Sequence, residues 1–438
     1  MRCKKYFTIG FLVVLTACTK YEDAELTDRN TFVHFYSSAS NYIGYVAEPD
    51  TDGGFILSGE VSHDNGFTDA LIIKTNARGQ MMWQTIIPDG LVKAIKPTAN
   101  GYVLVGDSIK LSPSSPEVHE LVNSYARLIL MDSKGTIVGQ HITSGSITTT
   151  VNNVDVILNV DYHGDAVALD HQGNIVVLGS FREPGKPEAS FLSAFNPSDI
   201  SDSLWYRSNK SLQHDYINCN ALHITPSSGI VWAAKMHMEE QNISRQFFSI
   251  PYLAPNSAQI NNSVYGESDS RNHAVEDIQK SSVGYGAIGT YSETNGLNAN
   301  MYFIRIDANL NVIPESERYI DGEHLLLNDS IMHKGSKTFS SSYDEGLAIV
   351  ATSDGYVLAG TMTSTPSVGN GGKDILLVKV DPFGDLLWKK LIGGTGDEVV
   401  SSIRETGDKG LLIFGTNTIN GLSSMMLIKT DRNGNLDN

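Results

Sequence analysis

Short apolar runs between glycines recur along the chain. In each, a glycine is followed by four mostly apolar residues and then by glycine or alanine. The copies stand at 54–59, 101–106, 284–289, 355–360 and 410–415, with a longer copy at 173–179 and a looser one, ending in alanine, at 229–234. Repeats of this kind are typical of folds that stack one supersecondary unit many times. The pattern predicts seven units.

A second apolar run follows each copy after a loop. These runs are five to seven residues long, rich in Ile, Leu, Val and Phe, and lie at 70–74, 126–131, 190–195, 246–250, 301–306, 375–380 and 425–430. Their length and their flanking turn residues favour strands over helices. Near-continuous apolarity indicates a sheet that is covered on both faces, as in stacked blades.

Tight turns then lead into a third run. Several turns have Asp in the first position and Gly in the fourth, which suits a type I turn or a bulged hairpin: 132–135, 381–384 and 431–434. Trp83 and Trp388 each stand four residues after a turn glycine and open that third run. A further strand, such as 399–403, leads into the next unit. Four antiparallel strands per unit describe one blade of a β-propeller.

The predicted fold is therefore all-β, a single seven-bladed propeller of four-stranded antiparallel blades over residues 31–438, with six or eight blades as the alternatives. The units are about 59 residues apart, more than the roughly 40–50 of familiar propeller repeats, so loops have been inserted. The chain ends at Asn438, where the outer strand of the last blade is due. Residues 31–36 belong to no complete blade and are expected to supply that strand and close the ring.

The first residues describe an export signal. Arg2, Lys4 and Lys5 precede an apolar stretch, and Leu15-Thr16-Ala17-Cys18 ends it. That tetrapeptide resembles the bacterial lipobox, which implies cleavage of residues 1–17 and lipidation of Cys18, with 18–30 as a flexible tether. Acyl chains on Cys18 would anchor the protein to a membrane. The acidic residues after Cys18 resemble the export signal of surface lipoproteins in Bacteroidetes, which implies the outer face of the outer membrane, although a periplasm-facing domain stays open.

The net charge limits the kinds of binding partner, and the cysteine content limits the sources of stability. The formal charge is −17, and a surface this negative repels phosphate backbones, so nucleic acid is not expected as a partner. Of the three cysteines, Cys3 would be cleaved away and Cys18 lipidated. Cys219 then stays alone, so the mature domain would depend on packing for its stability. A monomer is expected.

Residues 355–394 are similar to the propeller repeats of uncharacterised Bacteroidetes lipoproteins. The order is Asp-Gly-Tyr-Val-Leu-Ala-Gly-Thr, then Asp-Ile-Leu-Leu-Val-Lys-Val-Asp, then Gly, Trp and Gly-Gly. Asp381, Gly384 and Trp388 also resemble, more weakly, the docking motif of quinoprotein-type propellers, whose relatives include a scaffold of outer-membrane assembly. These resemblances imply fold and compartment, and they imply no reaction.

The sequence contains no HExxH, CxxC or GxSxG motif, and we expect no cofactor, no metal and no assigned catalytic residue. A polar cluster at Asp161, His163, Asp165, Asp170 and His171 fits turns around an inner strand better than a metal site. The sialidase-type Ser-x-Asp-x-Gly-x-x-Trp turn is not matched, since 381–384 is one residue too long.

Long insertions fall at 107–125, 361–373, 143–154 and 321–344, positions that a propeller places on one face. Elaborated loops on a rigid scaffold are the default recognition surface. On or near these loops lie the candidate binding residues His119, Tyr125, Arg182, His237, Tyr291 and His324.

Three functions stay open. The first is a non-catalytic binding or scaffold module for a glycan or a protein partner. The second is a propeller enzyme, such as a glycoside hydrolase or lyase, and the third is a scaffold for outer-membrane assembly. Charged or aromatic side chains converging in the central channel would favour the enzyme, whereas a featureless channel would favour binding.

Overall fold

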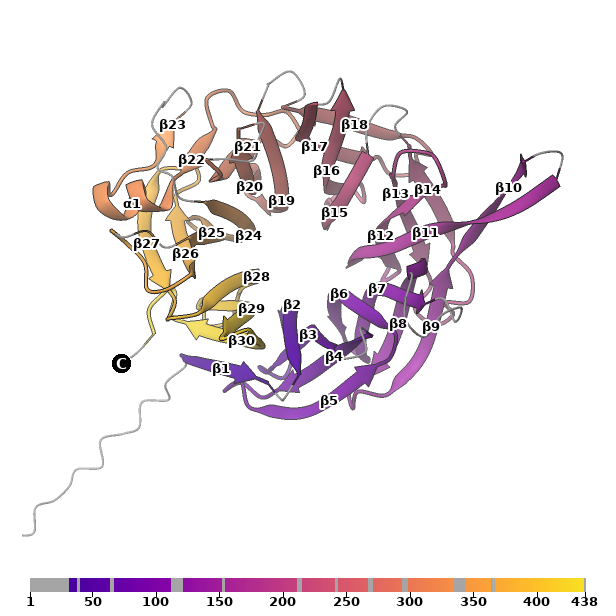
Figure 1. Cartoon of the computed structure of the whole chain (residues 1–438), viewed down its shortest axis with the longest axis horizontal. Helices are drawn as coiled ribbons and strands as arrows, with labels where there is room; N and C mark the ends of the chain where they lie inside the picture. The colour runs from indigo at the N-terminus through magenta and orange to yellow at the C-terminus, as the bar shows by residue number, and fades with distance from the viewer. Residues whose placement is uncertain are drawn as a thin grey trace, which may run out of the picture.

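The computed structural model describes residues 31–436 except 38–39, 64–66, 112–120, 152–153, 211–214, 241–242, 267–270, 294–297, 334–342, 364 and 366. In this part of the chain, seven antiparallel sheets stand around a central channel (Figure 1). The seven-bladed propeller is confirmed. The predicted lipidation site Cys18 and the candidate binding residue His119 lie outside the described residues.

Each blade runs from an inner strand at the channel to an outer strand at the rim. Blade one contains β2 (Asn41–Pro49), β3 (Phe55–Ser62), β4 (Thr68–Thr75) and β5 (Met81–Ile87). Blade two contains β6 (Gly90–Thr98), β7 (Gly101–Leu111), β8 (Leu121–Asp132) and β9 (Ile137–Thr143). Blade four contains β15 (Asp215–Ile224), β16 (Ile230–Glu240), β17 (Ile243–Leu253) and β18 (Ile260–Tyr265). Blade six contains β24 (Asp344–Thr352), β25 (Gly355–Thr363), β26 (Lys373–Val380) and β27 (Leu386–Ile392).

Two blades have a fifth strand where the sequence predicts inserted loops. In blade three, β10 (Gly145–Val151) pairs with the long β11 (Val154–Leu169), which continues to β12 (Ile175–Arg182), β13 (Ala189–Phe195) and β14 (Trp205–Asn209). Figure 1 shows β10 and the start of β11 projecting from the ring. Blade five contains β19 (Asn272–Ser281), β20 (Gly284–Ser292), β21 (Asn300–Ile306), β22 (Arg318–Ile320), the helix α1 (Gly322–Asn328) and β23 (Met332–His333).

The seventh blade closes the ring as the sequence predicts. Its strands β28 (Asp397–Glu405), β29 (Leu411–Ile419) and β30 (Leu422–Thr430) are completed by β1 (Phe32–Tyr36), which pairs with β30 over five residues. Phe32 and Tyr36 pack against the apolar cluster between blades seven and one, and the Tyr36 hydroxyl donates to the carbonyl of Gly79 at 2.6 Å. The first and last described strands are thus joined, and β1 supplies the fourth, outer strand of blade seven.

The core consists of apolar layers between neighbouring blades. The glycine-bounded runs of the repeat form the second strand of every blade, and the second apolar runs form the third. Both strands are buried on both faces, as in β25 and β26 of blade six. This burial explains why the sequence reads as continuous apolar runs and not as an alternation.

Candidate functional site

Every inner strand is interrupted by a β-bulge, which adds one residue relative to the second strand of its blade. The bulges interrupt the pairing of β2, β6, β11, β15, β19, β24 and β28. The residues at these bulges are Tyr45, Lys93, Asp165, Ala221, Glu276, Leu347 and Ser401, called here the bulge ring. A bulge re-aims a side chain and bends the strand, and bulges are common beside functional sites.

The second glycine of the repeat makes room for the bulge. A Cβ atom at Gly106 would lie 2.8 Å from the carbonyl carbon of Leu91 and 2.8 Å from Cα of Val92, and closer still to the carbonyl oxygen of Leu91. The corresponding approaches at Gly289 and Gly415 are 2.7 and 2.9 Å. Real Cβ atoms essentially never come within 3.0 Å of another atom in this way. The glycine repeat in the sequence therefore reports the position of the bulge.

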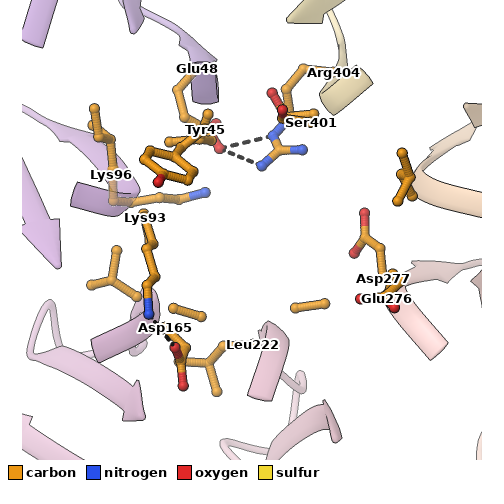
Figure 2. Close-up of a pocket in the computed structure, with 18 of the residues that line it drawn as sticks. Tyr45, Glu48, Lys93, Lys96, Asp165, Leu222, Glu276, Asp277, Ser401 and Arg404 are labelled. Atoms are coloured by element: carbon orange, nitrogen blue, oxygen red, sulfur yellow. Dashed lines mark hydrogen bonds and ion pairs between the residues drawn. The ribbon is translucent and has the colours of Figure 1, made fainter. Parts of the chain in front are cut away.

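The bulge ring surrounds a cavity of about 960 Å³ in the central channel, and all seven of its residues line it (Figure 2). The next charged positions, Glu48, Lys96 and Arg404, also line the cavity. Glu48 pairs with Ile56 near the tight turn after β2, while the start of β2 pairs with Ser62 beside the longer loop. Most of the cavity therefore lies towards the tight turns, and Ser180 and Glu188 of blade three extend it towards the face of the elaborated loops.

One side of the cavity carries a cluster of four titratable groups. The Lys93 ammonium lies 3.0 Å from Asp107 and 3.2 Å from Asp165, and His163 Nδ1 lies 3.2 Å from Asp107. Burial opposes ionisation of Asp107, but the hydrogen bond with His163 and the Lys93 charge lower its pKa overall. Burial raises the pKa of Asp165, and the hydrogen bond to Asp107 raises that of His163. Asp165 Oδ2 is buried and has no hydrogen-bond partner among the described residues.

Blades one and seven contribute a second ion pair. Nε and Nη2 of Arg404 both lie 2.8 Å from Oε1 of Glu48 (Figure 2). Tyr45 projects between this pair and Lys93 and donates its hydroxyl to Glu60 at 2.6 Å. Both charges of the Arg404 pair are thus neutralised within the protein.

Blade five supplies two adjacent carboxylates. Glu276 accepts from the Lys235 ammonium at 2.6 Å. Asp277 accepts from the backbone N–H groups of Ile278 at 2.8 Å and of Ile349, in the next blade, at 3.1 Å. Burial raises the pKa of Asp277 to about 6, against the opposing effect of Arg404 and of the two N–H groups.

The sequence-predicted candidates lie elsewhere, and none of those described lines the channel cavity. Arg182 ends β12, exposed, and forms ion pairs with Glu188 at 3.0 Å and Asp215 at 3.6 Å. Tyr125 and His237 are half-buried on β8 and β16. His324 is half-buried on α1, 3.0 Å from the Ser330 hydroxyl. Tyr291 is only 2% exposed, packed edge-on against Tyr319 and under Arg271, so it is a core residue and offers no surface to a ligand.

Sequence reasoning noticed His163 and Asp165 but placed them in turns, whereas they lie within β11 and line the cavity. It missed Tyr45, Lys93 and Glu276. The sequence did contain a signal for these residues. Each bulge-ring residue stands 13 or 14 residues before the second glycine or alanine of its repeat; Lys93, for example, stands 13 residues before Gly106.

Within the described residues, no three His, Cys, Asp or Glu side chains are grouped so that they could hold a metal ion. No helix in that part of the chain is long and apolar enough to cross a membrane.

No protein-family model matches the chain, and no curated protein matches it in sequence. Solved structures resemble it at low identity. A protein of unknown function from Dyadobacter fermentans has a TM-score of 0.46 and 7% identity, covering 91% of this chain and 97% of that one. Trypanosoma rangeli sialidase has a TM-score of 0.40 and 9% identity over 88% of this chain and 54% of its own. A neuraminidase-like protein of a bat influenza virus has a TM-score of 0.40 and 7% identity, covering 91% of this chain and 100% of that one. The chain spans about half the length of the sialidase. Likeness at this level says nothing about activity.

Proposed function

We propose that this propeller is an exported, lipid-anchored binding module whose ligand enters the central channel, and that it does not catalyse a reaction. The ligand is a glycan or the end of a protein chain. The observation that carries the proposal is the bulge ring, which brings Tyr45, Lys93, Asp165, Glu276 and Ser401 from five blades to one cavity of about 960 Å³. Pockets for small ligands have volumes of roughly 300–1,000 Å³ and a few converging polar groups.

The pairing of the channel charges favours binding over catalysis. Glu48, Glu276 and Asp107 are each held in an ion pair within the protein. Such groups are fixed in place by their partners, which suits hydrogen bonding to a ligand. Glycoside hydrolysis instead needs two carboxyl groups placed on either side of one bond, one of them holding a proton.

One observation keeps a hydrolase as the second candidate. Asp165 is 9% exposed, its pKa is raised by burial, and its Oδ2 accepts no hydrogen bond from a described residue. A buried carboxyl of this kind can hold a proton and act as a general acid. Asp277 would then be the partner carboxylate. Charged side chains also converge in the channel, which is the arrangement that the sequence analysis expected of an enzyme.

The lipobox-like Leu15-Thr16-Ala17-Cys18 supports the proposed compartment. We propose an outer-membrane lipoprotein of the Bacteroidetes type, displayed on the cell surface. Replacing Cys18 with Ser should leave the protein without acyl chains. The variant is then expected in the soluble fraction of a cell lysate, while the parent protein sediments with membranes. Equal sedimentation of the two would refute lipid anchoring.

A polysaccharide panel separates binding from catalysis. The purified mature protein is expected to be retained on at least one immobilised glycan or peptide without releasing reducing ends. Lys96→Ala should abolish retention, whereas Lys134→Ala, an exposed lysine in a turn of the same blade, should not. Release of reducing ends would establish the hydrolase. Retention that both variants preserve would place the ligand on the loop face and overturn the channel site.

A further inference from the structure

The charges of the cavity are distributed unevenly around the ring. The basic groups Lys93, Lys96 and Arg404 come from blades two and seven, with Glu48 of blade one paired to Arg404. The other acidic groups, Asp165, Glu188, Glu276 and Asp277, come from blades three and five. Figure 2 shows Glu276 and Asp277 across the open space from Lys93 and Lys96, whereas Asp165 lies beside the Lys93 ammonium. Between blades three and five, blade four contributes Ala221, Leu222 and His223, and burial lowers the pKa of His223. Lys96 and Asp277, the two cavity charges treated below, lie on opposite sides of the open space.

Most of these charges are satisfied inside the protein, but Lys96 is not. Lys93, Arg404 and Glu276 have ion-pair partners within 3.2 Å. Lys96 is exposed on β6 and forms no ion pair or hydrogen bond with any residue of the described chain. In Figure 2 its ammonium points into the open channel. It is available to an anionic group of a ligand.

Asp277 is the matching negative charge. It has backbone N–H partners but no cation within ion-pair distance among the described residues. The residues that follow the bulge in other blades are small or apolar, such as Val46, Ala94 and Ala348. In blade seven this position is Ser402, whose hydroxyl accepts from the N–H of Ala47 at 3.1 Å, as Asp277 does from Ile349. A neutral hydroxyl therefore performs the same structural role, and the fold does not require the charge of Asp277.

Asp165 adds an independent sign that something is to be bound on the acidic side. Its carboxyl is more than nine-tenths buried, and Lys93 contacts only Oδ1, at 3.2 Å. Oδ2 is left without a partner in the described structure. A buried acceptor without a donor is destabilising, so a ligand donor on the acidic side would recover part of that cost.

We propose that the channel binds a zwitterionic ligand, with its anionic group at Lys96 and its primary ammonium at Asp277 beside Asp165. This inference rests on the proposed function and names the chemistry of its ligand. A ligand with a single charge would leave one of the two free charges of the cavity uncompensated. Free amino acids or peptide ends carry the required pair of groups, and so do sugars that bear both an amine and a carboxylate.

A series of ω-amino acids measures the spacing of the two subsites. Glycine, β-alanine, 4-aminobutyrate and 6-aminohexanoate carry the same two charged groups at increasing separation, and butylamine and butyrate carry one each. Titration calorimetry with the mature protein is expected to show one preferred length, bound at least ten-fold more tightly than either singly charged compound. 2-Amino-2-deoxyglucuronic acid, tested beside the ω-amino acid that binds most tightly, distinguishes an amino sugar acid from an amino acid as the ligand.

Two variants locate the groups. Lys96→Met should weaken the preferred compound ten-fold or more and leave butylamine unchanged. Asp277→Ser, which keeps an acceptor for Ile349, should weaken it equally and leave butyrate unchanged. Lys134→Met is the matched control and should change nothing. If Asp277→Ser fails to fold, the exposed Lys96 still carries the test.

The proposal is overturned if butylamine binds as tightly as the best amino acid, or if no compound of the series and no amino sugar acid binds. It is also overturned if Lys96→Met leaves the affinity unchanged. These failures are distinct from failure of the proposed function, because glycan or peptide retention that depends on Lys96 would still locate an uncharged or singly charged ligand in the channel.

Discussion

Replacing Gly106 with Ala tests the link between the glycine repeat and the bulge ring. The new methyl group would lie 2.8 Å from the carbonyl carbon of Leu91 and from Cα of Val92, where ordinary contacts begin at 3.4 Å. Both atoms are backbone, so no side chain can rotate away. The inner strand β6 has to move, and with it Lys93 at the bulge.

The expected cost follows from this geometry. Overpacking a close-packed interior costs about 1–3 kcal/mol, and disturbing the neighbouring β6–β7 hydrogen bonds adds roughly 1 kcal/mol. We expect Gly106→Ala to lower the free energy of unfolding by about 3 kcal/mol, a large share of the 5–15 kcal/mol typical of domains. The control is Gly407→Ala, where a Cβ atom meets nothing within 4 Å, with an expected change within about 0.5 kcal/mol.

Urea denaturation followed by tryptophan fluorescence measures both variants. Because Lys93 moves with β6, Gly106→Ala should also weaken the channel ligand, whereas Gly407→Ala should not. Equal stability of the two variants would refute the steric origin of the repeat. Blade four provides a natural comparison, because Ala234 occupies the repeat position there and the bulge is displaced to Ala221.

Three further outcomes are expected. Deleting residues 31–36 removes β1 and should abolish cooperative unfolding. Phe35→Ser, which changes a side chain that is 53% exposed, should leave unfolding cooperative. Urea denaturation followed by circular dichroism measures both variants. Asp277 has a pKa of about 6 in the folded protein against 3.8 in a model peptide, so the folded state holds the proton more tightly than the unfolded state. The free energy of unfolding should therefore fall by at most roughly 3 kcal/mol as the pH rises from about 4 to 6. Asp277→Ser should lack this pH-dependent component, and an unchanged pH profile of unfolding would contradict the reasoning. Arg318→Met should lower the free energy of unfolding in urea by about 3 kcal/mol, because the buried guanidinium donates to the carbonyls of Gly384 and Phe383 in the next blade. A loss below about 1 kcal/mol would show that these hydrogen bonds do not hold the two blades together.

The fold was predictable because the close approach between the first two strands of a blade favours one residue type, glycine. In six of the seven blades the second strand has glycine where it closely approaches the bulged inner strand, and Gly106, Gly289 and Gly415 are three of these. The closing strand β1 was predictable by counting strands, because the last blade lacked an outer strand and residues 31–36 formed a strand that belonged to no other blade. The insertions were located but not their structure, because 143–154 and 321–344 lack the glycine pattern and instead form β10 and α1.

The site was not predictable from the same signals. The bulge breaks the alternation of the inner strands, so Lys93 and Glu276 read as ordinary solvated charges. Insertions directed attention to the loop face, where Arg182 and His324 lie, whereas the cavity lies towards the tight turns. Which side chains converge depends on the closure of the ring, since Arg404 and Glu48 are 356 residues apart in sequence and form one ion pair.

Blade four shows how a departure from the repeat shapes the site. Where six blades have glycine, Ala234 stands, and the inner strand accommodates its methyl group by moving the bulge and turning Ala221 to a φ of 54°. A positive φ is unfavourable for every residue with a Cβ atom and most unfavourable for bulky or β-branched ones. Blade four therefore places a methyl group at the bulge, where blades one, two, three and five place Tyr, Lys, Asp or Glu. It also contributes His223, whose pKa is lowered by burial, so blade four adds no carboxylate between those of blades three and five. The departure from the repeat thus leaves the carboxylates of blades three and five as the acidic groups on which ligand binding would depend.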